Sequence, residues 1–167
     1  MNQWPKQHKI HLNEFYGNPD VNGDGQPDPA WEAANLIYIT PPYPIWWSWG
    51  PECKKIRIHR KCADSLRNIL EGIGKHVNAV DRNKYQLNEC GGAYNFRLVR
   101  GSNKVLSTHS WGCAIDLAPD LNPLGKRYKP EAGMMPKVVV ELFKAQGWEW
   151  GGLWERPDGM HFQACRV

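Results

Sequence analysis

The chain has 167 residues, of which 41% are hydrophobic and 23% are charged, values that argue against a disordered, collagen-like or membrane-spanning protein. Lys and Arg number 21 against 17 Asp and Glu, and this net charge of +4 is too small to indicate a nucleic-acid-binding protein. Nine Trp, sixteen Gly and thirteen Pro indicate a compact protein that is rich in loops.

The first half of the chain contains two segments with loop composition. Residues 17–30 are polar and rich in turn formers, and residues 40–51 are interrupted by four prolines, so both predict ordered loops over the core. Alternation at Ile56 and Ile58 predicts a short strand. The apolar positions from Cys62 to Val77 then recur at helical spacing and predict a helix.

The second half of the chain predicts one more helix and several short strands. The helix is predicted from Pro136 to Gly147, because proline favours a first helical turn and glycine a C-terminal cap. Short apolar runs predict strands at residues 93–99, 114–117, 148–150 and 160–163. The fold class is therefore α+β, a small, mainly antiparallel sheet with two principal helices and long N-terminal loops.

No linker or repeat divides the sequence, so we expect a single domain over residues 1–167. The N-terminal residues lack the basic and then apolar order of a secretory signal, and no apolar run reaches the roughly 18 residues of a membrane span. Five cysteines without a C-x-x-C pair favour reduced thiols. We expect cytoplasmic synthesis without a signal peptide and no membrane insertion.

Residues 20–28 match the first half of a calcium-binding loop. Oxygen-bearing side chains stand at positions 1, 3, 5 and 9 of the motif, with a glycine at position 6; they are Asp20, Asn22, Asp24 and Asp28. The match ends at position 12, which is Trp31, and no flanking helices are evident. Asx-rich turns have the same composition without an ion, so a calcium site and an Asx-turn loop are both open.

Two segments, residues 107–116 and 154–163, combine side chains that bind metals. His109 and Asp116 are seven residues apart, and Gly112 offers a bend between them. With His161 on an adjacent strand, two imidazoles and a carboxylate would provide three ligands, and a hydrolytic zinc site leaves its fourth position to water.

Asp158 lies on a Pro-Asp-Gly turn three residues before His161, where a carboxylate can take a proton from water beside a metal. On spacing alone an alternative stays open, in which His109 and His161 are structural histidines satisfied by hydrogen bonds. Four other histidines, two in the N-terminal arm and two beside the first predicted helix, are interpreted as structural.

The pattern Ser-x-His-x-x-Gly-x-Ala-x-Asp at residues 107–116, followed by Asp-x-x-His-Phe at residues 158–162, resembles the signature of the zinc D-alanyl-D-alanine metallopeptidases. This family includes VanY-type carboxypeptidases, VanX-type dipeptidases and phage endolysins that cut L-alanyl-D-glutamate bonds in bacterial wall peptides. The resemblance covers residues 90–163, and residues 14–17 and 31–39 are also similar to the phage branch. It implies a hedgehog/D-Ala-D-Ala-peptidase-like fold.

The resemblance implies one catalytic zinc ion and assigns roles around it. His109, Asp116 and His161 correspond to the zinc ligands. Asp158 corresponds to the general base that later donates a proton to the leaving amine.

The resemblance also implies substrate-binding residues. An arginine upstream of the first ligand stabilises the oxyanion or the substrate carboxylate in this family, and Arg97 is preferred to Arg100 for this role. Ser107 corresponds to a serine that can bond the substrate backbone. For either arginine the alternative is a solvated charge at a strand edge.

From this resemblance we expect zinc-dependent hydrolysis of a peptide bond in the stem peptide of bacterial peptidoglycan, by a monomeric phage endolysin that depends on a holin for release. The alternatives are a resident D-alanyl-D-alanine carboxypeptidase, a non-catalytic zinc-containing binding module and a calcium-stabilised surface-binding protein. The small positive charge would favour approach to an anionic wall. The aromatic cluster Trp46–Trp49 predicts either a glycan or peptide groove or closure of the core.

Overall fold

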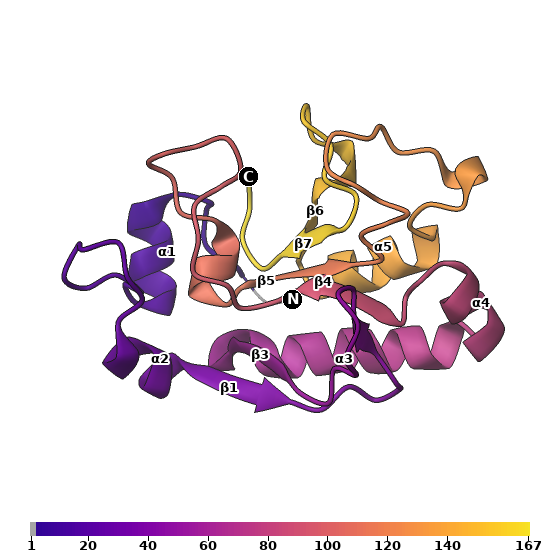
Figure 1. Ribbon diagram of the computed structural model, residues 1–167, viewed down its shortest axis with the longest axis horizontal. Helices are drawn as coiled ribbons and strands as arrows, with labels where there is room; N and C mark the ends of the chain where they lie inside the picture. The colour runs from indigo at the N-terminus through magenta and orange to yellow at the C-terminus, as the bar shows by residue number, and fades with distance from the viewer. Residues whose placement is uncertain (1–2) are drawn as a thin grey trace.

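A computed structural model describes residues 3–167 (Figure 1). The helices are α1 (Lys9–Tyr16), α2 (Pro29–Asn35), α3 (Arg60–His76), α4 (Ala79–Lys84) and α5 (Lys137–Ala145). The strands are β1 (Leu36–Ile39), β2 (Trp46–Trp47), β3 (Ile56–His59), β4 (Glu89–Gly92), β5 (Ala114–Leu117), β6 (Glu149–Trp150) and β7 (His161–Gln163), with 3-10 turns η1 (Thr108–Trp111), η2 (Pro130–Ala132) and η3 (Gly151–Leu153). The predicted α+β class is confirmed.

The described strands form two sheets. The larger sheet has the order β2-β4-β5-β7-β6, in which only β2 and β4 run parallel, and the smaller sheet pairs β1 with β3 antiparallel. At the centre of the larger sheet β5 and β7 place Asp116 opposite His161. The sheet is therefore mainly antiparallel, as the sequence predicts.

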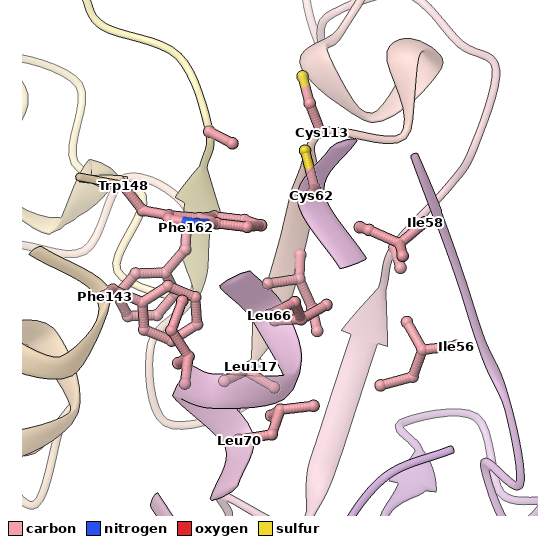
Figure 2. Close-up of a cluster of buried hydrophobic side chains, with 14 of the residues drawn as sticks. Ile56, Ile58, Cys62, Leu66, Leu70, Cys113, Leu117, Phe143, Trp148 and Phe162 are labelled. Atoms are coloured by element: carbon pink, nitrogen blue, oxygen red, sulfur yellow. The ribbon is translucent and has the colours of Figure 1, made fainter. Parts of the chain in front are cut away.

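The core lies on one side of these central strands and is built around α3. Helix α3 contacts β1, β3 and α5, and Figure 2 shows Leu66 and Leu70 between the isoleucines of β3 and the aromatic rings on the other side. Among those rings, Phe162 of β7 is fully buried and stacks on Phe143, with centroids 3.8 Å apart. Burial of a Phe side chain contributes about 2 kcal/mol. Because side chains alternate along a strand, this anchor turns His161 to the opposite face.

His59 shows how the first sheet is joined to α3. Its Nδ1 accepts a hydrogen bond from the amide of Lys61 at 3.1 Å and so caps the helix, while its Nε2 lies 3.0 Å from the carbonyl oxygen of Tyr16. Burial lowers the pKa of His59 to about 4, so the ring is neutral. The structural interpretation of this histidine agrees with these contacts.

The predicted strand at residues 93–99 is wrong. The strand lies at Glu89–Gly92, and residues 93–99 lie outside both sheets, where Leu98 forms an isolated bridge with Leu106. The register of β4 shifts between Cys90 and Gly92, and Gly92 has a φ of 145°, which favours glycine. The apolar run that suggested a strand instead follows β4.

Other boundaries also differ from the prediction. Helix α5 begins at Lys137, with Pro136 as its N-cap, and ends two residues before Gly147. Short elements occupy segments that were predicted as loops, since α2 begins within residues 17–30 and β2 lies within residues 40–51. The remainder of those two segments is irregular, as expected.

All five cysteines carry free thiols and are buried. Burial raises the pKa of Cys53 to about 11 and that of Cys62 to about 12. Within residues 3–167, no helix has the length and apolar character needed to cross a membrane.

Candidate metal centre

Three side chains from separate elements meet at the centre of the large sheet. His109 comes from η1, Asp116 from β5 and His161 from β7, and their ligand atoms all lie within 4.8 Å of one another. Asp116 Oδ1 is 3.2 Å from His109 Nε2 and 2.9 Å from His161 Nδ1. Of residues 3–167, this is the only group of three or more His, Cys, Asp or Glu side chains arranged in this way.

A left-handed glycine brings the first two of these residues together. Gly112 ends η1 with a φ of 63°, and its amide donates to the carbonyl oxygen of His109 at 3.0 Å. A Cβ atom at this position would lie 2.7 Å from Leu36 Cδ2 and 2.9 Å from the backbone nitrogen of His59. Both the backbone conformation and the available space therefore require glycine at the bend that the sequence suggests.

The orientation of His109 is set by a backbone carbonyl. Its Nδ1 lies 2.5 Å from the carbonyl oxygen of Ala93, which can only accept, so Nδ1 carries a hydrogen and Nε2, which faces Asp116, is the nitrogen available to a metal. The next residue, Tyr94, bonds through its hydroxyl to Glu32, which also pairs with Arg57 at 3.4 Å. This network ties the Ala93 segment to α2 and β3.

Asp116 is held in its charged form. Burial disfavours the carboxylate, but the neighbouring imidazoles of His109 and His161 outweigh this effect and hold the pKa of Asp116 well below its usual range. A charged carboxylate and a bare imidazole nitrogen are the forms in which these side chains bind a metal. The donor set of two nitrogens and one oxygen fits zinc, which prefers such ligands.

A cavity of about 200 Å³ opens beside this centre. Of the residues predicted to bind zinc, to act in catalysis or to bind substrate, all except His109 line it: Arg97, Arg100, Ser107, Asp116, Asp158 and His161. The calcium candidates at residues 20–28 do not line it. The other lining residues are Gln7, Val99, Thr108, Leu124, Trp154, Arg156, Met160 and Gln163. The fold therefore brings the residues singled out in the sequence for this site to one cavity.

Asp158 has an unusual environment in this cavity. Its Oδ1 is buried without a hydrogen-bond partner among the described residues. Burial raises its pKa above the usual value, the charge of Asp116 acts in the same direction, and His161, His109 and Arg100 oppose the increase. A partly desolvated carboxylate with a raised pKa beside a metal centre is suited to proton transfer.

The predicted substrate-binding residues occupy different positions around the cavity. Ser107 Oγ accepts from the amide of His109 at 3.4 Å and so caps η1. The Arg97 guanidinium donates to the carbonyl oxygen of Leu98 at 3.3 Å. Arg100 is exposed at the rim.

Sequence reasoning missed Arg156, a third arginine at the same cavity. Its Nη1 donates to the carbonyl oxygen of Arg100 at 3.0 Å, which joins two lining loops. Its position two residues before Asp158 was the available signal.

Two of the four candidate calcium ligands at residues 20–28 bond to nearby backbone, whereas Asp20 Oδ1 is buried without a hydrogen-bond partner among the described residues. Asp24 Oδ1 accepts from the amide of Gln26 at 2.9 Å, and Asp28 Oδ1 accepts from the amide of Trp31 at 2.7 Å, which caps α2. These contacts are those of the Asx-turn alternative. Helices α1 and α2 do flank the loop, contrary to expectation, but no described contact supports calcium binding by Asp20 or Asn22.

The aromatic cluster at residues 46–49 lies at the surface. Trp46 is 40% exposed and Trp49 is 64% exposed, and the rings of Trp47 and Trp49 stack with centroids 4.9 Å apart. The exposed members of the cluster therefore do not close the core.

The comparisons with known proteins point to the same segment of the chain. A family model described as D-alanyl-D-alanine carboxypeptidase matches residues 100–164. The match contains η1, β5 and β7, and thus the whole candidate metal centre with Asp158. No curated protein and no solved structure is significantly similar to the chain. The resemblance carried by residues 107–116 and 158–162 is thereby confirmed.

Proposed function

We propose, from the premise that residues 100–164 carry the pattern of a D-alanyl-D-alanine carboxypeptidase family, that the protein is a zinc-dependent peptidase of peptidoglycan stem peptides. His109, Asp116 and His161 would hold the metal. The observation that carries this proposal is their convergence, with Asp158, beside one cavity inside the matched segment. The chain would act as a single domain over residues 1–167.

Within this proposal the protein side chains handle the proton. Zinc, when bound, supplies Lewis acidity that polarises the scissile carbonyl and acidifies water. Asp158 takes one proton as the water oxygen bonds to the carbonyl carbon, and returns it to the nitrogen as the carbon–nitrogen bond breaks. The unpartnered Oδ1 of Asp158 and its raised pKa support both steps.

The charge of the cavity supports an acidic substrate. Arg97, Arg100 and Arg156 line it together, and guanidinium groups bind carboxylates through paired hydrogen bonds. Arg97 would hold the oxyanion or a substrate carboxylate, Arg100 a substrate carboxylate at the rim, and Ser107 the substrate backbone. Stem peptides carry free carboxylates, which makes them suitable ligands.

For the bond that is cut, the proposal favours an endopeptidase of the phage endolysin type, released by a holin and acting on the wall as a monomer. The similarity of residues 14–17 and 31–39 to the phage branch supports this choice. The description of the matched family instead favours the alternative, removal of a terminal D-alanine by a carboxypeptidase. A zinc-containing binding module would bind wall peptides without cutting them.

Digestion of purified peptidoglycan followed by mass spectrometry of the products separates these alternatives. Release of D-alanine alone indicates a carboxypeptidase, and new amino termini within the stem peptide indicate an endopeptidase. No product from the zinc-loaded protein would contradict the peptidase proposal and favour the binding module.

Asp158→Asn tests the proposed proton transfer. We expect turnover to fall by roughly 10²- to 10⁴-fold, because the amide cannot accept the proton, while zinc content and melting temperature stay near those of the parent. Glu155→Gln is the matched control, since Glu155 is exposed nearby and does not line the cavity. Equal rates for Asp158→Asn and the parent would remove Asp158 from the mechanism.

A further inference from the structure

We propose that Gln163 is a positioning residue for the metal centre. Its amide, braced by Gln7 of the N-terminal arm, fixes His161 in the form that carries its hydrogen on Nε2 and presents a bare Nδ1 to the metal. This inference rests on the proposed role of His161 as a ligand. It adds two residues, one of them outside the segment that matches the family, to the groups on which metal affinity depends.

The orientation of the Gln163 amide follows from its neighbours. Its Nε2 lies 2.8 Å from Gln7 Oε1 and 3.4 Å from the carbonyl oxygen of Cys165, and its Oε1 lies 3.0 Å from His161 Nε2 and 3.3 Å from Thr108 Oγ1. A backbone carbonyl can only accept a hydrogen bond, so the NH₂ group must face Cys165. The flipped amide would set two oxygens against each other at a buried position.

This orientation decides which nitrogen of His161 carries the hydrogen. Because the oxygen of Gln163 can only accept, His161 Nε2 must donate to it. Nδ1 is then the nitrogen left for a metal: it lies 2.9 Å from Asp116 Oδ1 and 3.2 Å from His109 Nε2, and a bound metal would take the place of a hydrogen on Nδ1. Groups that hold the second nitrogen of a metal-binding histidine set its tautomer and ring orientation.

The N-terminal arm, the described residues before α1, holds the NH₂ side of the Gln163 side-chain amide in place. The backbone N–H of Gln7 donates to the carbonyl oxygen of Arg166 at 2.6 Å, and the backbone N–H of Arg166 donates to the carbonyl oxygen of Pro5 at 2.8 Å. The backbone before α1 is thus paired with the backbone near the C-terminus. Trp4 is buried and donates to the carbonyl oxygen of Gln146 at 2.9 Å. Gln7 is therefore presented by an anchored backbone, and its side chain also lines the cavity.

Two substitutions at position 163 separate positioning from general stability. Gln163→Met keeps the length of the side chain but removes the nearer acceptor for His161 Nε2, leaving only Thr108 Oγ1 at 3.3 Å, whereas Gln163→Glu keeps the nearer acceptor. Both remove the donors to Gln7 and Cys165, so both should lower the melting temperature. We expect zinc affinity, measured by competition with a chromophoric chelator, to fall by roughly 10- to 100-fold for Gln163→Met and to stay within a few-fold of the parent for Gln163→Glu.

A variant in the arm extends the test. Gln7→Met leaves the Gln163–His161 contact in place and removes only its brace, so we expect a loss of zinc affinity smaller than that of Gln163→Met. Parent-like affinity in Gln163→Met would overturn the proposal. Affinities that simply follow melting temperature across all three variants would also overturn it, because they would indicate a structural role only.

A spectroscopic measurement on the parent protein tests the inference independently of folding in the variants. Long-range proton–nitrogen correlation spectra distinguish the two neutral forms of histidine. In zinc-loaded protein we expect the hydrogen of His161 on Nε2 and the metal on Nδ1; a hydrogen on Nδ1 would contradict the inference. If the parent binds no zinc at all, the ligand assignment under the proposed function fails instead, and the two failures are therefore distinguishable.

Discussion

His59 and His161 are both buried histidines, yet the two differ in how their ring nitrogens are used. Backbone groups of Lys61 and Tyr16 occupy both nitrogens of His59. In His161 one nitrogen faces the Gln163 amide and the other faces the carboxylate of Asp116. A histidine whose two nitrogens are both held by backbone groups has no nitrogen left for a metal. In His161 the neutral partners, Gln163 and Thr108, lie on Nε2, so Nδ1 beside the carboxylate is left for one.

The two environments are also physically joined. The His59 amide donates to the carbonyl oxygen of Gly112 at 2.8 Å, and the Gly112 amide donates to that of His109 at 3.0 Å. The structural histidine and the first candidate ligand thus share one backbone connection through a left-handed glycine. A change at this junction should disturb both.

The largest expected difference between His59 and His161 is in zinc affinity after substitution. We expect His161→Ala to weaken zinc binding by roughly 10³-fold or more, since it removes one of the three proposed ligands. His59→Asn should keep zinc binding and lose stability instead, with the Asn oxygen able to cap α3 in place of Nδ1. Isothermal titration with zinc and chemical denaturation of both variants check this, and strong zinc binding by His161→Ala would contradict the distinction.

A smaller effect is expected at the junction between them. Gly112→Ala should lower the free energy of unfolding by about 3 kcal/mol or more, because the added methyl group meets Leu36 and the backbone of His59 in a left-handed conformation. Gly133→Ala is the matched control, with a φ of 74° and nothing within 4 Å of an added Cβ. Equal losses in urea denaturation would mean that the close approach at Gly112 is unimportant.

The smallest expected effect is the pH dependence of stability that His59 contributes. Burial lowers its pKa to about 4, below the ordinary value of about 6.5, so the unfolded chain takes up the proton first. Its contribution to stability is complete above about pH 6.5 and declines toward pH 4, by up to about 3 kcal/mol. The difference in unfolding free energy between parent and His59→Asn, measured across this range, should therefore shrink or reverse on acidification. A constant difference would show that His59 does not titrate there.

The candidate ligands could be predicted because metal chemistry restricts both residue type and spacing. His109, Gly112 and Asp116 lie within one short segment, and the bend between them needs the glycine that the sequence contains. Helix α3 could also be predicted from the sequence, since a long apolar stripe at helical spacing has few other interpretations.

The missed features depend on local chemistry that periodicity does not report, or on distant contacts. Asp28 and Pro29 carry the N-cap and first-turn signals of α2, but their segment also matched a calcium loop. Two glycines gave β4 no apolar alternation to detect. The contact between Gln7 and Gln163 joins residues 156 positions apart, and no local pattern reports such a pair.

Because every cysteine is buried, the folded protein can be labelled at a single introduced cysteine. With five thiols inside and the pKa values of Cys53 and Cys62 raised, a maleimide reagent has no accessible native target in the folded chain. Leu153 is 73% exposed and precedes Trp154, which lines the cavity. A fluorophore attached through Leu153→Cys would therefore be the single label beside the cavity and could report binding of the proposed wall peptides without removal of any native cysteine.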